Sequence, residues 1–326
     1  MTTPGRARGY HAGAVMGRAE ASGRFPWLAA VDWEAVSSVF PVRLPRGYLG
    51  DAHTPGDPRL LTALPANAEL EADVGDIPDP VGEQARSPLP WVVRKHEDRV
   101  LLLLTKRCHV YCRFCFRRDH QPGEGEDPSD VEWGAMLDYA RASGAKEVIL
   151  SGGDPLAVTD ARLFAAIDGV RPEVPVIRVH TRAPITFPSR ITAKLVEGLR
   201  ARAPVWVFVH VNHPAELTAE VDAALARLVD AGVPVVNQSV LLRSVNDDAA
   251  TLAALSHALV ERRVFPYYLH HPDAVPGNAA FRVPLAEGRR IYASLRRMVS
   301  GLALPTYVMD PPDGSGKFAI PVDASG

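Results

Sequence analysis

The stretch RVLLLLTKRCHVYCRFC, residues 99–115, joins an apolar run to a loop that contains every cysteine of the chain. Residues 100–104 predict a strand that is buried on both faces, because successive apolar side chains leave no face for water. The loop after this run spaces Cys108, Cys112 and Cys115 as C-x3-C-x2-C. An odd number of cysteines packed this closely is no disulfide framework, so the pattern indicates chemistry on thiolates.

These three thiolates suit an iron–sulfur cluster that has one open iron. A fourth cysteine would close a [4Fe–4S] cubane, whereas three leave one iron free for a small ligand, for which S-adenosylmethionine is the candidate. Two alternatives stay open: a structural zinc with His109 or His120 as fourth ligand, and three inert buried thiols. The position of the loop, after the first strand of a repeating series, favours the cluster.

Downstream of this loop, apolar runs alternate with helical stretches. Strands are predicted at residues 100–104, 147–150, 176–179, 206–209, 233–236 and 264–269, and helices at residues 128–143, 161–170, 190–201, 216–231, 247–262 and 285–301. Such strand-then-helix units in series predict an α/β fold with a parallel sheet. Six units favour an incomplete (β/α)6 barrel, with a doubly wound open sheet as the alternative. Each strand ends in polar residues, where barrels of this type carry their active sites.

Three regions are predicted along the chain. Residues 1–90 are rich in proline, glycine and acidic residues, and form an irregular or helical N-terminal extension with short helices near residues 26–39 and 58–64. Residues 91–302 form the partial barrel, and residues 303–326 a short C-terminal segment. Residues 1–18 lack the continuous apolar run of a secretory signal, so we expect a frayed tail and a cytoplasmic protein.

The charge balance excludes some classes of partner. Lys and Arg total 36 and Asp and Glu total 38, for a formal net charge of −2. This leaves no basic footprint for nucleic acid, and no apolar run is long enough to predict a membrane span. We therefore expect an enzyme that acts on a small molecule.

A glycine-rich segment, made of Ser151, Gly152, Gly153 and Asp154, follows the second predicted strand. Alone, Gly-Gly-Asp-Pro is an ordinary turn signal. Together with the cysteine loop after the first strand, it resembles the radical S-adenosylmethionine superfamily. The resemblance implies a [4Fe–4S] cluster on the three cysteines, and contacts from these four residues to the methionyl amino group of S-adenosylmethionine.

The stretch DPPDGSGK, residues 310–317, closes a Gly/Ser loop on Lys317. Most such lysines are solvated, although an amine can hold the aldehyde of pyridoxal 5′-phosphate. Residues 89–321 resemble the lysine 2,3-aminomutase family, including the type that makes β-lysine for elongation factor P. The likeness is carried by residues 108–118, 151–155, 237–247, 266–273 and 310–317. It implies that Lys317 is the catalytic lysine that binds pyridoxal 5′-phosphate.

The resemblance also implies roles for four residues near this cofactor. Lys95 and Arg99 match basic positions that hold the cofactor phosphate, and Asn237 and Gln238 match polar residues near the two cofactors. The family has arginine at the first of these positions. Lys95 is therefore a departure, because an ammonium binds phosphate as a point charge and not as a fork.

Three further residues are implied to bind the substrate. Arg117 matches the family residue that holds the substrate carboxylate, which suits a guanidinium fork; alternatively it is a surface arginine paired with Asp119. Asp273 and Asp310 match carboxylates that bind a distal ammonium in lysine-specific members, although each could be an ordinary turn residue beside proline. Two carboxylates favour a cationic side chain, with lysine first and arginine or ornithine as alternatives.

The predicted function is thus an isomerase, a 2,3-aminomutase that moves the α-amino group of L-lysine to the β-carbon. An external donor such as flavodoxin or ferredoxin is expected to reduce the cluster, and a homo-oligomer is left open. One alternative is a radical enzyme that works without pyridoxal phosphate. Another is a non-catalytic zinc- or cluster-binding module that docks a translation factor.

Overall fold

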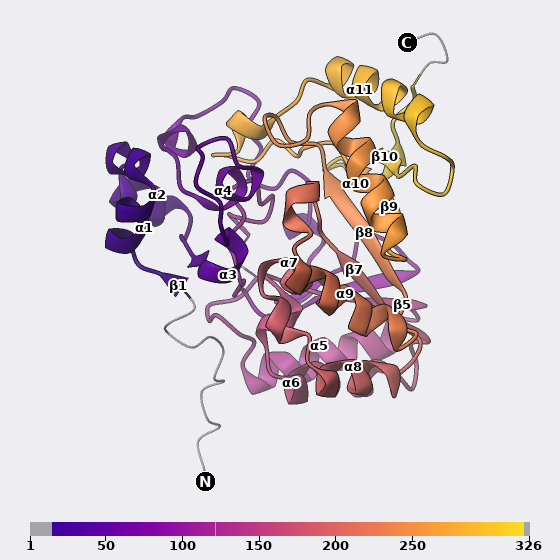
Figure 1. The fold of residues 1–326 in the computed structure, drawn as a ribbon. Helices are drawn as coiled ribbons and strands as arrows, with labels where there is room; N and C mark the ends of the chain where they lie inside the picture. The colour runs from indigo at the N-terminus through magenta and orange to yellow at the C-terminus, as the bar shows by residue number, and fades with distance from the viewer. Residues whose placement is uncertain (1–14, 121, 323–326) are drawn as a thin grey trace.

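The computed structural model describes residues 15–120 and 122–322, which are organised around a nine-stranded sheet (Figure 1). Its parallel strands stand in chain order: β4 (Arg99–Leu103), β5 (Glu147–Ser151), β6 (Val176–Thr181), β7 (Val205–Val209), β8 (Val235–Val240), β9 (Phe265–His270) and β10 (Thr306–Met309). Antiparallel strands β3 (Val92–Val93) and β11 (Phe318–Ala319) form the two edges. The sheet is therefore open, and because its order never reverses, the doubly wound alternative is wrong.

One helix or helical pair follows each of the first six parallel strands. They are α5 (Asp130–Ala142), α6 (Asp160–Val170), α7 (Ala183–Thr186) with α8 (Ala193–Arg200), α9 (Ala219–Asp230), α10 (Ala249–Glu261) and α11 (Leu285–Met298). The side chains that cap α5, α6, α8, α9 and α10 accept a hydrogen bond from the amide three residues on; they are Ser129, Thr159, Thr192, Thr218 and Asp248. The six predicted strand-then-helix units are thus present.

A seventh parallel strand, β10, was not predicted. It is only four residues long and follows Pro305, so its apolar pattern is too short to stand out. β10 pairs in parallel with β9, and β11 folds back on β10 as an antiparallel partner. This pairing brings Lys317, which directly precedes β11, to the edge of the sheet.

The N-terminal segment packs beside the sheet (indigo in Figure 1). It contains β1 (Val15–Met16) paired with β2 (Leu44–Pro45), and the helices α1 (Arg18–Arg24), η2 (Pro26–Ala30), α2 (Trp33–Val39), α3 (Arg46–Leu49) and α4 (Pro58–Ala63). The short helices predicted near residues 26–39 and 58–64 are confirmed. Residues 1–14, which hold most of the predicted tail, lie outside the described residues.

A buried ion pair fastens this segment to the cysteine loop. The Glu69 carboxylate accepts hydrogen bonds from Arg113 at 2.5 Å and from Arg118 at 2.8 Å. All three side chains are almost fully buried. Because a lone buried charge is costly, the two arginines and the glutamate require one another.

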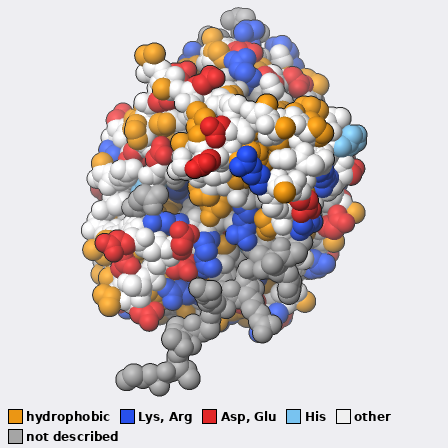
Figure 2. Space-filling view, turned by 90° about the vertical axis from the view of Figure 1, so that its left-hand side faces the viewer, with side chains coloured by type: hydrophobic (Ala, Val, Ile, Leu, Met, Phe, Trp, Pro, Cys, Tyr) orange, Lys and Arg blue, Asp and Glu red, His pale blue; other side chains and the backbone are white. Residues whose placement is uncertain are grey.

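The strands present different residues to their two faces. In β6, Ile177 and Val179 are fully buried, whereas Arg178 and His180 alternate with them and line a cavity. Figure 2 shows the side of the molecule on which the N-terminal segment lies, and acidic and basic side chains are interspersed there. No described helix is both long and apolar enough to cross a membrane.

Candidate active site

A cavity of about 530 Å³ opens at the carboxyl ends of the parallel strands. It is lined by the three cysteines, by the segment after β5, by Arg117 and by Lys317. The other predicted residues that line it are Lys95, Arg99, Gln238, Asp273 and Asp310. Residues from both ends of the chain therefore share one cavity, as expected where parallel strands end together.

The cysteine loop rests directly on the two glycines after β5. The Gly153 amide donates to the carbonyl of Thr105 at 2.6 Å. A Cβ on Gly152 would lie 2.3 Å from that carbonyl oxygen, and one on Gly153 would lie 2.4 Å from the carbonyl oxygen of Arg107. Gly152 also has a φ of 126°, which side chains rarely allow. Both positions thus require glycine so that the loop can approach.

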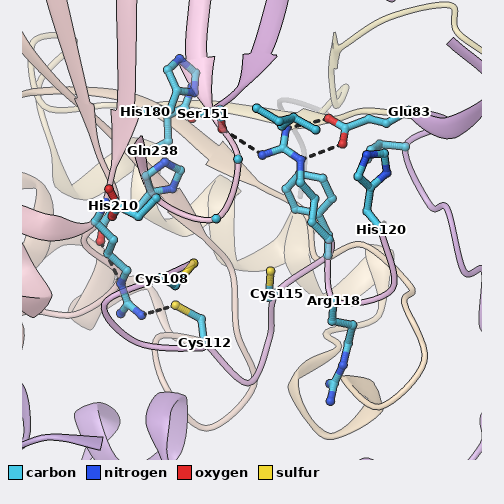
Figure 3. Close-up of a pocket in the computed structure, with 18 of the residues that line it drawn as sticks. Glu83, Cys108, Cys112, Cys115, Arg118, His120, Ser151, His180, His210 and Gln238 are labelled. Carbon is cyan, nitrogen blue, oxygen red and sulfur yellow. Dashed lines mark hydrogen bonds and ion pairs between the residues drawn. The ribbon is translucent and has the colours of Figure 1, made fainter. Parts of the chain in front are cut away.

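Cys108, Cys112 and Cys115 face one another across this loop (Figure 3). Burial, reinforced by the neighbouring thiols, raises the pKa of Cys108 well above its ordinary value and that of Cys115 to about 11. A cationic cluster would offset this cost, because iron binds the thiolate and releases the proton.

In the part of the chain that the structure describes, no set of side chains is arranged to bind a single zinc ion. No three His, Cys, Asp or Glu side chains there converge on a point that could hold one metal ion. His109 is buried, with its ring 5.3 Å from that of Phe187. A cubane places each thiolate on its own iron, so three sulfurs around a shared volume fit a cluster better than one zinc.

Arg182, which follows β6, was missed by sequence reasoning. Its Nη1 donates to the Cys112 sulfur at 2.8 Å, and its Nη2 donates to the Tyr48 hydroxyl at 2.9 Å and to the Glu216 carboxylate. The Asp154 carboxylate accepts from the Arg182 amide at 2.9 Å and from Thr181 at 2.7 Å. The Asp154 side chain therefore connects the carboxyl ends of β5 and β6 through hydrogen bonds.

Arg117 lines the cavity and is held by two partners, Glu83 and Ser151, which are labelled in Figure 3. Its Nε and Nη2 each donate to the Glu83 carboxylate at 2.7 Å, and its Nη1 donates to the Ser151 hydroxyl at 2.9 Å. The alternative of a surface arginine paired with Asp119 is wrong. Glu83 comes from the N-terminal segment, and nothing local in the sequence marked it.

Lys317, which also lines the cavity, lies beside Tyr268, with its ammonium 5.2 Å from the ring centroid. Burial lowers the pKa of Lys317 to about 8, although Asp310 and Asp273 act in the opposite direction. A sizeable fraction of this amine is therefore neutral near pH 8 and able to attack an aldehyde. This fits a lysine that holds pyridoxal 5′-phosphate.

The two acidic residues near Lys317 differ in their surroundings. Asp310 accepts from Lys95 at 2.7 Å, and Lys95 also donates to the carbonyl of Val81. Burial, and then the charge of Asp310, raise the pKa of Asp273 to about 7. Lys95 is thus paired with a carboxylate, and its part in phosphate binding stays a prediction. Lys317 and Lys95 lower the pKa of Asp273, but by less than burial and Asp310 raise it.

Two predicted neighbours of the cofactors also differ in placement. Gln238 lines the cavity, but Asn237 does not. The Asn237 amide accepts from the Val211 backbone N–H at 2.8 Å and donates to the Val211 carbonyl at 3.1 Å. Its polar atoms join β8 to the chain after β7, and its place near the cofactors stays a prediction.

Three histidines that end or follow strands also line the cavity: His180, His210 and His270. Burial lowers the pKa of all three, to about 4 for His210, so their rings are neutral at physiological pH. His180 stacks on Phe208 with 4.5 Å between ring centroids. Their position at the ends of predicted strands was the signal that could have found them.

Comparison with known proteins extends this picture. The profile of the Radical SAM superfamily matches residues 102–255. An L-lysine 2,3-aminomutase of Clostridium subterminale is 42% identical over 83% of this chain and 66% of its own. A relative in Aquifex aeolicus, named provisionally as an L-lysine 2,3-aminomutase, is 35% identical over 86% of this chain and 78% of its own. A glutamate 2,3-aminomutase of Clostridioides difficile is 35% identical over 81% of this chain and 63% of its own.

The chain spans just under two thirds of the length of the Clostridium subterminale enzyme. The similarity nevertheless covers most of this chain, and the superfamily profile begins inside β4, immediately before the cysteine loop. The chain therefore belongs to the lysine 2,3-aminomutase family of radical S-adenosylmethionine proteins.

Proposed function

We propose that the protein is a 2,3-aminomutase that uses S-adenosylmethionine and pyridoxal 5′-phosphate to move the α-amino group of L-lysine to the β-carbon. The observation that carries the proposal is one cavity lined both by the cysteine loop and by Lys317 with Asp273 and Asp310. The consecutive strand order fits an incomplete barrel with six strand-then-helix units at residues 91–302, after an N-terminal extension at residues 1–90. The C-terminal cofactor segment at residues 303–326 adds β10 and β11 to the same sheet.

Cys108, Cys112 and Cys115 would hold the [4Fe–4S] cluster, and Lys317 would hold pyridoxal phosphate. S-adenosylmethionine at the cluster supplies a carbon-centred radical for hydrogen abstraction, and pyridoxal phosphate supplies a conjugated ring through which an amino group can migrate. The protein's share is to orient the substrate and to exclude water around the reacting atoms. An external donor such as flavodoxin or ferredoxin provides the electron.

Different residues of the cavity suit the α-carboxylate and the side-chain cation of a cationic amino acid. Arg117 offers N–H donors to the α-carboxylate, since only some of its donors are used by Glu83 and Ser151. Burial and the nearby charge of Asp310 raise the pKa of Asp273 to about 7, so its ionised form would gain from a further cation. A side-chain ammonium or guanidinium would satisfy it, whereas the carboxylate of glutamate would repel it.

Anaerobic reconstitution with iron, sulfide and pyridoxal phosphate tests the proposal. The protein, given S-adenosylmethionine and a reductant, is assayed with lysine, arginine and glutamate for β-amino products. We expect β-lysine as the main product. Lys317→Ala should abolish turnover and leave the visible absorbance of the cluster, so normal turnover in this variant would contradict the proposal.

Two outcomes separate the alternatives. If the main product is formed from arginine, the protein is still a 2,3-aminomutase, but its substrate is arginine and not lysine. A cluster-loaded protein that consumes S-adenosylmethionine without any bound pyridoxal phosphate would favour a radical enzyme of another type.

A further inference from the structure

The loop at residues 79–86 joins the N-terminal segment to β3 and carries Glu83 into the cavity wall. The Asp79 carboxylate holds the loop, accepting from the amides of Glu83 and Gln84 at 2.8 Å each. Glu83 is 5% exposed, so its carboxylate is buried and needs a partner.

That partner is Arg117, and the geometry of the pair is specific. The two Glu83 oxygens accept from Nε and Nη2, which is one edge of the guanidinium. Ser151 accepts from Nη1. A guanidinium has five N–H groups, so among the described residues each terminal nitrogen keeps one N–H beyond these bonds.

We propose that Glu83 is a positioning residue for substrate recognition, which holds Arg117 so that its remaining N–H donors bind the α-carboxylate of the amino acid. This inference rests on the proposed function and deepens it. An arginine side chain without such a partner samples many rotamers and would have to be ordered each time a substrate binds. Glu83 orders it beforehand and acts only through Arg117.

The same loop also reaches the side-chain end of the site. The Val81 carbonyl accepts from Lys95, which in turn donates to Asp310. Arg86 donates to the carbonyl of Pro312 at 3.1 Å. The loop therefore contacts Arg117, which would hold the substrate carboxylate, and through Lys95 it also contacts Asp310, which would hold the distal ammonium.

Glu83→Gln is the central test, because it keeps the shape of the side chain and removes its charge. Rates are measured with L-lysine and with L-lysinamide, whose neutral amide replaces the carboxylate. We expect Glu83→Gln to lower kcat/KM for lysine by about 10- to 100-fold, mainly through KM. The loss for lysinamide should be much smaller, so the preference for lysine over lysinamide collapses. Glu71→Gln, at an exposed glutamate of the same N-terminal segment, is the matched control and should behave as wild type.

A double-variant cycle separates positioning from a merely structural role. If Glu83 acts through Arg117, the Glu83→Gln change should cost little once Arg117→Lys is already present. Equal losses for lysine and lysinamide, or fully additive losses in the double variant, would overturn the inference. Glu83→Asp, which keeps the charge with a shorter reach, should retain an intermediate preference and serves if Glu83→Gln does not fold.

The outcomes distinguish this inference from the function on which it rests. Wild-type turnover of lysine with an unchanged preference in Glu83→Gln would refute the positioning role and leave the aminomutase intact. A wild-type protein that forms no β-amino acid from any tested substrate would overturn both.

Discussion

Replacing Asp273 with Asn should stabilise the folded protein at pH 8 while it removes a residue of the proposed substrate site. The pKa of Asp273 is about 7 in the folded state, against an ordinary value of 3.8. Burial is the main cause, and the nearby charge of Asp310 is the next. The folded protein therefore holds an ionised carboxylate at pH 8 without a satisfying partner.

The pKa shift sets the size and the pH range of the effect. Because the folded state binds this proton more tightly than the unfolded state, stability falls as the pH rises from about 4 to about 7. A shift of roughly three units corresponds to at most about 4 kcal/mol at pH 8. Water entry and local relaxation reduce this figure, so we expect a gain of about 1–4 kcal/mol for Asp273→Asn.

Asp310→Asn is the matched control and should have the opposite sign. Asp310 is paired with Lys95 at 2.7 Å, and the Lys95 side chain is only 8% exposed. Removing that carboxylate leaves a buried ammonium without its counter-ion, which destabilises the protein. The two substitutions are chemically identical and lie in the same cavity, so only their partners differ.

Denaturant unfolding of the cluster-free protein under reducing conditions, at pH 5 and pH 8, measures both changes. The gain for Asp273→Asn should be larger at pH 8 than at pH 5, where the wild-type carboxyl is protonated in the folded state. A gain that is equal at the two pH values, or a loss at pH 8, would refute the reasoning. In the reconstituted enzyme the same variant should lose lysine turnover in spite of its higher stability.

Three other predictions concern different parts of the structure. The rate at which pyridoxal phosphate forms an adduct with Lys317, trapped with borohydride and measured by mass spectrometry, should rise with pH and reach half its maximum near pH 8. A half-maximal rate near pH 10.5, the ordinary pKa of lysine, would contradict the buried environment. Gly153→Ala should lower iron and sulfide bound per chain by roughly half or more, because its Cβ would lie 2.4 Å from a carbonyl oxygen of the cysteine loop, and wild-type loading would argue against that contact. Glu69→Gln should lower the free energy of unfolding by about 3–5 kcal/mol, since it leaves Arg113 and Arg118 buried without a carboxylate, and a denaturant curve like that of wild type would disprove this.

Local signals in the sequence were enough for the scaffold. The six strand-then-helix units could be predicted because each has its own run of apolar residues and its own cap or turn. The cysteine loop could be predicted because its chemistry lies within eight residues. β10 was missed because a four-residue strand after a proline carries too little pattern, although its pairing with β9 is what brings Lys317 to the cavity.

The pairings inside the site could not be predicted in the same way. Arg117 meets Glu83 across 34 residues of chain, and Lys95 meets Asp310 across 215. Arg182 reaches Cys112 from a strand end 70 residues later. No periodicity or spacing in one sequence records such contacts, since each depends on how separate elements pack.

The sequence by itself determined the kind of chemistry: three thiolates in one loop, a parallel βα series and a lysine in a glycine-rich turn, each readable within a short window. Only the tertiary structure decided which charges meet. It paired Lys95 with Asp310 and Arg117 with Glu83, and it buried Asp273 so that the pKa of this carboxyl rises to about 7. The physical reason is that the free energy of an ionised side chain depends on its burial and on partners brought from distant parts of the chain. Both are properties of the packed fold.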